Sequence, residues 1–162
     1  MGFLKFIDSS LLNEDTVDAR YINSPFKDLK NLQSRSKGSR FEKIASGIFK
    51  ALGHTVQKPE STDYDVLVNG KKYEIKGSTL AKGTNVFSFL QIRPDQDYDY
   101  MMFMMFFPED LEVLLLNKQQ VLDCISKNIF KKQHGGKKAE SGTYCFYGTR
   151  DELLALGAVE LK

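Results

Sequence analysis

Two carboxylates and a lysine stand close together in the stretch TDYDVLVNGKKYEIKGS, residues 62–78. Its Asn-Gly pair at 69–70 is preferred in two-residue type I′ turns, so the segment predicts a β-hairpin. In the register that this turn imposes, Asp65 lies directly opposite Glu74, with Cβ atoms about 5 Å apart. Lys76 lies two residues beyond Glu74 and therefore shares the same face of the sheet.

Two carboxylates at that separation repel each other by roughly 3 kcal/mol at an effective dielectric constant near 20, so a positive charge is expected between them. A divalent cation is the natural candidate, because Mg²⁺ binds one or two carboxylates, keeps several waters and completes its shell with phosphate oxygens. Two alternatives stay open. Lys76 would neutralise the acids as a plain ion pair, or the hairpin would be a surface feature without a role.

The elements that must position the hairpin follow from hydrophobic periodicity. Apolar residues at helical spacing, with Gly53 as a stop, predict an amphipathic helix over 40–52. The run MMFMMFF, residues 101–107, is apolar on both faces and predicts a central buried strand. Further strands are predicted over 54–57, 65–68, 71–76, 86–93, 111–116 and 144–147, and loops over 77–85 and 131–143.

Capping signals place two more helices. Asn117 is expected to cap a helix over 118–126 that buries Val121, Leu122 and Ile125. Thr149 and Glu152 form a capping box for a last helix. In the strand predicted over 86–93, Phe87, Phe89 and Gln91 are expected to share one face.

Composition limits the classes of function. A chain of 162 residues with 41% hydrophobic residues fits one globular domain, in which we take 1–35 as an accessory segment and 36–162 as the main body. Cys124 and Cys145 form no CxxC pair, so neither a zinc site nor a disulfide framework is indicated. Neither a signal peptide nor a stretch of ~20 apolar residues occurs, so we expect a cytoplasmic protein without a membrane span. The P-loop and GxGxxG motifs are absent, so no nucleotide cofactor is expected.

The net charge of +2 does not by itself mark a nucleic-acid binder. Basic residues nevertheless gather in 27–43 and 127–138, where they would suit DNA phosphates or simply form solvated surface.

Asp65, followed after eight residues by Glu74-Ile75-Lys76 and preceded by a helix carrying Glu42 (GSRFEKIASGIFKALGHTV), resembles the PD-(D/E)XK nuclease superfamily over residues 36–116. The segments QIRPDQDYDYMMF and PEDLEVLLLNKQQVL, with the later HGG and GTY, look like small type II restriction-endonuclease-like proteins. The resemblance implies an α/β fold with a restriction-endonuclease-like core, in which helices flank a central mixed β-sheet. One departure is that Tyr64 stands where the family name has proline.

The resemblance also implies roles. Asp65 and Glu74 would bind Mg²⁺, with Mn²⁺ as an expected substitute and the Ile75 carbonyl as a possible third ligand. Lys76 would orient or deprotonate the attacking water. Glu42 would point into the site and bind the metal directly or through water, although Ser39 and Glu42 also form a capping box that gives Glu42 a purely structural alternative.

The expected partner is double-stranded DNA, cut by a homodimer, because one site cuts one strand. Candidate DNA contacts are the hydroxyl groups, amide and cations of Ser78, Thr79, Gln91, Arg93, Lys37, Arg40, Lys131, Lys132, His134, Lys137 and Lys138. Each has the alternative of an ordinary loop or strand residue. Two other functions stay open, namely a nuclease resembling archaeal Holliday-junction resolvases and a DNA-binding module with an idle site.

Overall fold

The computed structural model describes residues 18–133 and 142–162 and builds them around two β-sheets. The elements in chain order are the 3-10 helix η2 (Ala19–Tyr21), α2 (Lys27–Asn31), α3 (Ser34–Ala51), β1 (Val56–Gln57), β2 (Val66–Val68), β3 (Lys71–Thr79), β4 (Phe87–Ile92), β5 (Tyr100–Phe106), β6 (Leu111–Asn117), α4 (Lys118–Ser126), β7 (Lys131–Lys132), β8 (Tyr144–Gly148), α5 (Arg150–Ala155) and β9 (Val159–Glu160).

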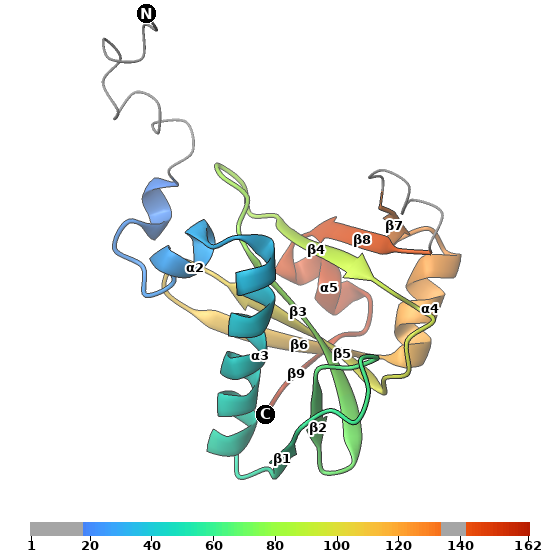
Figure 1. Cartoon of the computed structure of the whole chain (residues 1–162). Coiled ribbons are helices and arrows are strands. Elements are labelled where there is room, and N and C mark those ends of the chain that lie inside the picture. Colours follow the sequence, from blue (N-terminus) through green and yellow to red (C-terminus); the bar gives the residue numbers. More distant parts are fainter. Residues whose placement is uncertain (1–17, 134–141) are drawn as a thin grey trace, which may run out of the picture.

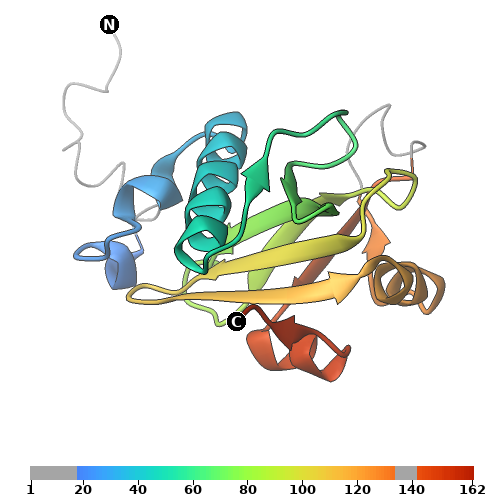
Figure 2. The ribbon, with the colours of Figure 1, turned by 90° about the horizontal axis from the view of Figure 1, so that it is seen from below.

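The larger sheet has the order β1-β2-β3-β5-β6-β9, in which β3 and β5 are parallel and the other neighbours are antiparallel. The antiparallel small sheet has the order β4-β8-β7. Figure 2 shows α3 on one face of the larger sheet and α5 on the opposite face. The predicted α/β class, with a central mixed sheet flanked by helices, is confirmed.

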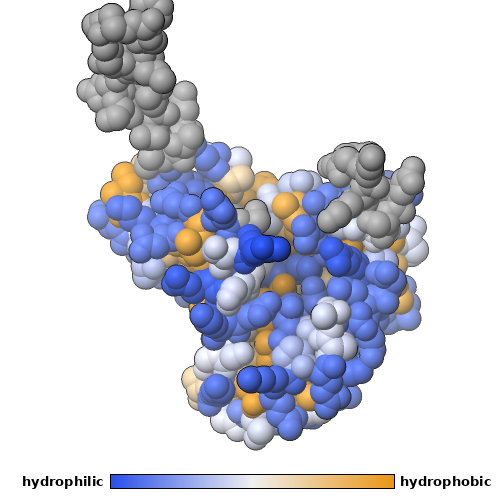
Figure 3. Space-filling view, in the orientation of Figure 1, coloured by the Kyte–Doolittle hydropathy of each residue, from blue (hydrophilic) through white to orange (hydrophobic). Residues whose placement is uncertain are grey.

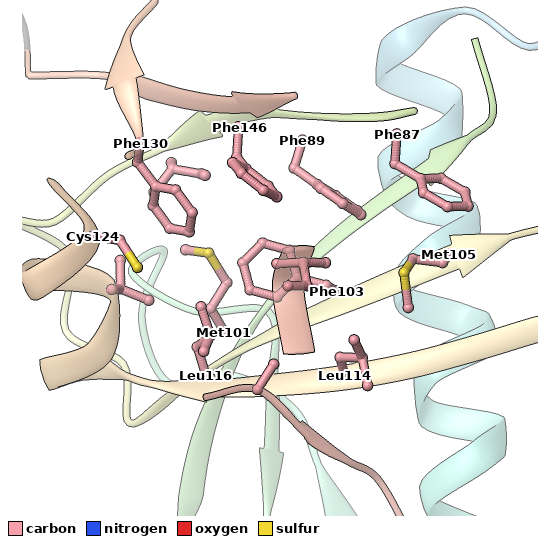
Figure 4. Close-up of a cluster of buried hydrophobic side chains, with 14 of the residues drawn as sticks. Phe87, Phe89, Met101, Phe103, Met105, Leu114, Leu116, Cys124, Phe130 and Phe146 are labelled. Carbon is pink, nitrogen blue, oxygen red and sulfur yellow. The ribbon is translucent and has the colours of Figure 1, made fainter. Parts of the chain in front are cut away.

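The central strand β5 separates two hydrophobic clusters. Met102, Met104 and Phe106 pack toward α3, whereas Met101, Phe103 and Met105 pack toward the small sheet. Figure 4 shows Phe103 facing Phe89 and Phe146 across this second cluster. The prediction that 101–107 forms a buried central strand is confirmed, because side chains on both of its faces are fully buried.

The hairpin register is also confirmed. Asn69 and Gly70 have φ of 51° and 78°, as a type I′ turn requires, and Val66 pairs with Tyr73 across it. Val66 and Val68 lie in the cluster against α3. The opposite face of β3 is therefore left for Glu74 and Lys76.

Several boundaries differ from expectation. The helix predicted over 40–52 begins at Ser34, and β3 runs on to Thr79 because its far end pairs in parallel with β5, up to Thr79 opposite Phe106. Gln91 does not share the buried face of Phe87 and Phe89. A bulge there gives it a φ of 56° and leaves it exposed.

The C-terminal half needs smaller corrections. Asn117 caps α4 in a full capping box with Gln120, as predicted in position, but Leu122 is exposed and Cys124 is buried in its place. Thr149 caps α5 as expected. The predicted loop 131–143 begins with strand β7, and β9 has no counterpart in the sequence prediction.

The segment before α3 is fastened to the sheet by polar contacts. The Tyr21 hydroxyl donates to the Phe106 carbonyl (2.6 Å) and accepts from the Leu80 N–H (2.9 Å), at the ends of β5 and β3. Arg20 donates to the Ala81 and Thr84 carbonyls at 2.9 and 2.6 Å. These bonds tie residues 20–21 to the chain just after β3.

Gly77 allows α3 to lie close to β3. A Cβ atom at Gly77 would come within 2.6 Å of the Phe41 ring, which is itself buried and stacked on Phe106. We expect Gly77→Ala to lower the free energy of unfolding by about 1–3 kcal/mol, because the ring has no free space to move into. Chemical denaturation measures this.

Gly47→Ala is the matched control. Gly47 lies within α3, and a Cβ atom added there would meet nothing within 4 Å apart from its chain neighbours and the backbone of its own helix, so alanine should stabilise the helix by about 0.5–1 kcal/mol. Equal effects of the two substitutions would contradict the close contact of α3 and β3.

Candidate active site

Asp65 stands where β2 and β3 begin to separate. Its N–H donates to the Tyr73 carbonyl (2.9 Å), and its Oδ2 accepts from the Ile75 N–H (2.7 Å). The second bond fixes the carboxylate against β3 although β2 itself begins only at Val66. The ladder ends at the pair Val66–Tyr73, so the predicted pair Asp65–Glu74 lies just beyond it, but the two carboxyl groups are close enough to interact.

Glu74 and Lys76 form a buried ion pair. Glu74 is only 7% exposed, and the Lys76 Nζ donates to its Oε1 at 2.9 Å. The ion pair that was an alternative at the sequence level is thus present. Burial nevertheless raises the pKa of Glu74 to about 7, and the Asp65 carboxylate adds to the rise, while Lys76 opposes it. One ammonium does not offset both burial and a second carboxylate, so the site still favours positive charge.

Glu42 reaches the same site from α3. Because α3 begins at Ser34, Ser39 lies inside the helix, and the capping-box alternative for Glu42 is wrong. Glu42 is exposed as a residue, but partial burial of its carboxyl group, followed by the neighbouring Asp65 carboxylate and a hydrogen bond with it, raises its pKa. Asp65 consequently stands between Glu42 and Glu74, and each outer carboxyl group interacts with the central one.

The donor set fits Mg²⁺ only as a partial cage. Within residues 18–133 and 142–162, no three histidine, cysteine, aspartate or glutamate side chains group tightly enough to hold a metal ion alone. Mg²⁺ requires only one or two protein carboxylates, because waters complete its shell. Asp65 and Glu74 meet that requirement. The Ile75 carbonyl faces their edge too, since a strand residue directs its N–H and C=O to the same side.

The other predicted contacts are spread around this site. Lys37 and Arg40 lie on α3, where burial lowers the pKa of Lys37 and Arg40 is exposed. Thr79 is half-buried at the end of β3. The remaining exposed candidates are Gln91, Arg93, Lys131 and Lys132. His134, Lys137 and Lys138 lie outside the described residues. In the view of Figure 3, the surface between α3 and β4 is predominantly hydrophilic.

The Ser78 hydroxyl forms hydrogen bonds within the protein. Its hydroxyl donates to the Thr79 carbonyl (2.7 Å) and accepts from the Ser88 N–H (2.9 Å), and the residue is 8% exposed. The hydroxyl joins the larger sheet to β4. This geometry does not favour the predicted phosphate contact.

Sequence reasoning missed Tyr98 and Lys118 beside Glu74. The Tyr98 hydroxyl is buried without a hydrogen-bond partner among the described residues, and burial, followed by Glu74, raises its pKa. The Lys118 Nζ lies 3.8 Å from the centre of the Tyr98 ring. In the sequence, the alternating aspartates of PDQDYDY mark this loop as polar. Which of its residues becomes buried beside Glu74 depends on the path of the loop.

Comparisons with known proteins leave the family open. No protein-family model matches the chain, and no curated protein matches it either. The solved structures similar to it include a bacterial homing endonuclease, I-Ssp6803I. That likeness has 15% sequence identity and a TM-score of 0.49, and it covers 73% of this chain and 76% of the other. Similarity at this level does not assign a function. No helix in the described part of the chain has the length and apolar character of a membrane span.

The pKa of Glu74 predicts an unusual dependence of stability on pH. Between its ordinary pKa of 4.5 and about 7, the folded protein holds a proton that the unfolded chain releases. The free energy of unfolding should therefore fall as pH rises through this window, by up to about 3 kcal/mol. Denaturant titrations in EDTA at pH 5 and pH 8 measure the change.

Glu74→Gln supplies the comparison, because the amide keeps the size of the side chain but does not titrate. We expect the difference between pH 5 and pH 8 to shrink in this variant. Parallel pH profiles for the two proteins would rule out Glu74 as the source.

Proposed function

We propose that the chain is a Mg²⁺-dependent DNA endonuclease of the restriction type. The observation that carries the proposal is the grouping of Asp65, Glu74 and Lys76 at the point where β2 and β3 separate, with Glu42 reaching in from α3. This combination of acids and amine is the one implied by the resemblance to PD-(D/E)XK nucleases. A cation bound at this site would also explain why Asp65 and Glu74 remain together although burial and mutual repulsion disfavour their charged forms.

In this proposal, Asp65 and Glu74 bind the cation, the Ile75 carbonyl is a further ligand, and Glu42 acts directly or through water. When bound, Mg²⁺ would lower the pKa of a water molecule and neutralise phosphate oxygens, and Mn²⁺ should substitute. The residues of the chain then have distinct tasks. The Ile75 N–H holds Asp65 in place, and Lys76 exchanges its contact with Glu74 for the attacking water or the phosphate.

The proposed substrate is double-stranded DNA. One site of this kind cuts one strand, so a double-strand break requires a homodimer or two successive nicks. The exposed cations Arg40, Arg93, Lys131 and Lys132 would contact the phosphate backbone.

The test is digestion of supercoiled plasmid and linear genomic DNA in Mg²⁺, Mn²⁺ or EDTA, followed by sequencing of the ends. Discrete fragments that require the metal are expected. Cleavage confined to four-way junctions would replace the restriction role with a junction-resolving one. Tight DNA binding without cleavage in any divalent metal would instead indicate a binding module with an idle site.

A further inference from the structure

The small sheet has one buried face and one open face. Phe87, Phe89 and Phe146 point into the core. Because strand side chains alternate, Ser88 and its cross-strand partner Tyr147 point away from it. Tyr147 is 59% exposed, an unusual degree of exposure for a large aromatic side chain. Figure 1 shows β4 and β8, the two strands that carry this open face, side by side.

A pocket of about 340 Å³ lies on this face, beside Tyr147. Among the described residues, Ile129, Cys145 and Tyr147 give it apolar walls, and Lys131, Lys132 and Gln133 add polar groups to its lining. The volume lies at the lower end of the range for small-ligand sites, roughly 300–1,000 Å³. We call it the Tyr147 pocket.

The polar part of the lining is partly fixed. The Gln133 Oε1 accepts from the Gln91 N–H at 2.7 Å, at the bulge that interrupts β4. This bond orients the amide and leaves its nitrogen as a donor. Both lysines of β7 are exposed and form no ion pair within the described ranges.

The charge of the small sheet suits a polyanion. Strands β4, β7 and β8, with sequences FSFLQI, KK and YCFYG, contain no acidic residue. By contrast, the loop that follows β4 carries Asp95, Asp97 and Asp99. The lysines of β7 therefore give the Tyr147 pocket a local positive charge that attracts phosphate groups.

The two lysines alone could contact the phosphate backbone of a duplex. The apolar walls and the Tyr147 ring, however, favour a ligand that also has an apolar or planar group. A stacked duplex presents phosphates and base edges, whereas an unpaired base presents a planar π-face. A group that combines a planar face with adjacent phosphates is a nucleotide of an unpaired strand.

We propose that the Tyr147 pocket binds an unpaired nucleobase of a DNA strand, with the Tyr147 ring stacked on the base and Lys131 and Lys132 on the flanking phosphates. The choice of DNA rests on the proposed nuclease function, but the pocket itself does not take part in the hydrolysis. The Ser78–Ser88 bond joins β4 to β3, the strand that carries Lys76, and β4 pairs with β8, the strand that carries Tyr147.

The proposal is tested by DNA binding in EDTA, where no metal-dependent cleavage occurs. The probes are a single strand with one 2-aminopurine, the matching duplex, and that duplex with the 2-aminopurine as a single-base bulge. The full chain is compared with Tyr147→Ala and Tyr147→Phe. Because Tyr147 is largely exposed, both variants should fold, which circular dichroism and the melting temperature verify.

Tyr147→Ala should weaken binding of the single strand and the bulge about 5- to 100-fold, as expected for the loss of one base–aromatic stack, and leave duplex binding unchanged. Tyr147→Phe should bind like the original chain. Quenching of 2-aminopurine fluorescence on binding should disappear only with alanine. Lys131→Gln should weaken all three probes equally and reduce the salt dependence.

Equal weakening of duplex and single strand by Tyr147→Ala would overturn the proposal in favour of a duplex contact. Unchanged binding of all probes, or no binding of any probe, would also overturn it. These outcomes are independent of the nuclease assignment. If the chain quenches 2-aminopurine but cuts no DNA, the pocket proposal stands and the nuclease proposal fails. If it cuts DNA without quenching 2-aminopurine, only the nuclease proposal stands.

Discussion

Asp65→Asn is expected to lower the rate of Mg²⁺-dependent DNA cleavage at least about a thousandfold, because it removes the charge on the central carboxylate of the site. The substitution is close to isosteric, and the asparagine oxygen can still accept from the Ile75 N–H. The loss should therefore come from chemistry rather than unfolding. Single-turnover nicking of supercoiled plasmid measures it, alongside DNA affinity in EDTA, which should not fall.

Asp63→Asn is the matched control, since Asp63 lies two residues earlier, outside the β2–β3 pair. Its cleavage rate should stay within a few-fold of that of the original chain. Lys76→Met should lower the cleavage rate to a similar extent as Asp65→Asn. If both Asp65→Asn and Lys76→Met retain the original rate, the assignment of this site as a nuclease centre fails.

Phe103→Ala is expected to have the largest effect on stability. The ring is fully buried at the middle of β5, with its centre 5.0 Å from that of Phe89 and 6.3 Å from that of Phe130. Figure 4 shows it between the two sheets, where its loss would leave a cavity lined by both. Large-to-small changes of this kind cost about 3–5 kcal/mol. The melting temperature should drop by about 10 °C in a domain of this size.

Leu122→Ala provides the contrast on α4. Leu122 is 37% exposed, and alanine is a good helix former, so its free energy of unfolding should change by less than about 1 kcal/mol. A loss at Phe103→Ala no greater than that at Leu122→Ala would show that the second hydrophobic cluster does not hold the sheets together.

Local sequence was enough to place half of the site. Asp65 and Glu74 belong to one hairpin, and the turn at Asn69-Gly70 sets their register without help from the rest of the chain. Local sequence alone does not place Glu42, because its position depends on how closely α3 approaches β3. This approach depends on the contact between Gly77 of β3 and the Phe41 ring of α3, two residues that are far apart in the sequence.

Long-range pairing explains what the sequence did not predict in the fold. The extension of β3 to Thr79 depends on β5, which follows more than twenty residues later. The bulge at Gln91 arises where β4 pairs with β8, over fifty residues away, so strict alternation placed Gln91 on the wrong face. Tyr98 was missed because it lies in a loop, and the path of a loop is not encoded in period-two or helical spacing.

The hydroxyl of Tyr21 bridges the ends of the two parallel strands, one of which carries Lys76. Any fragment prepared for biochemistry should therefore retain residues 18–30. A shorter version trimmed to the start of α3 would let the last pairs of that parallel ladder fray, and weak DNA cleavage by such a preparation would reflect the trimming rather than the chemistry of the site.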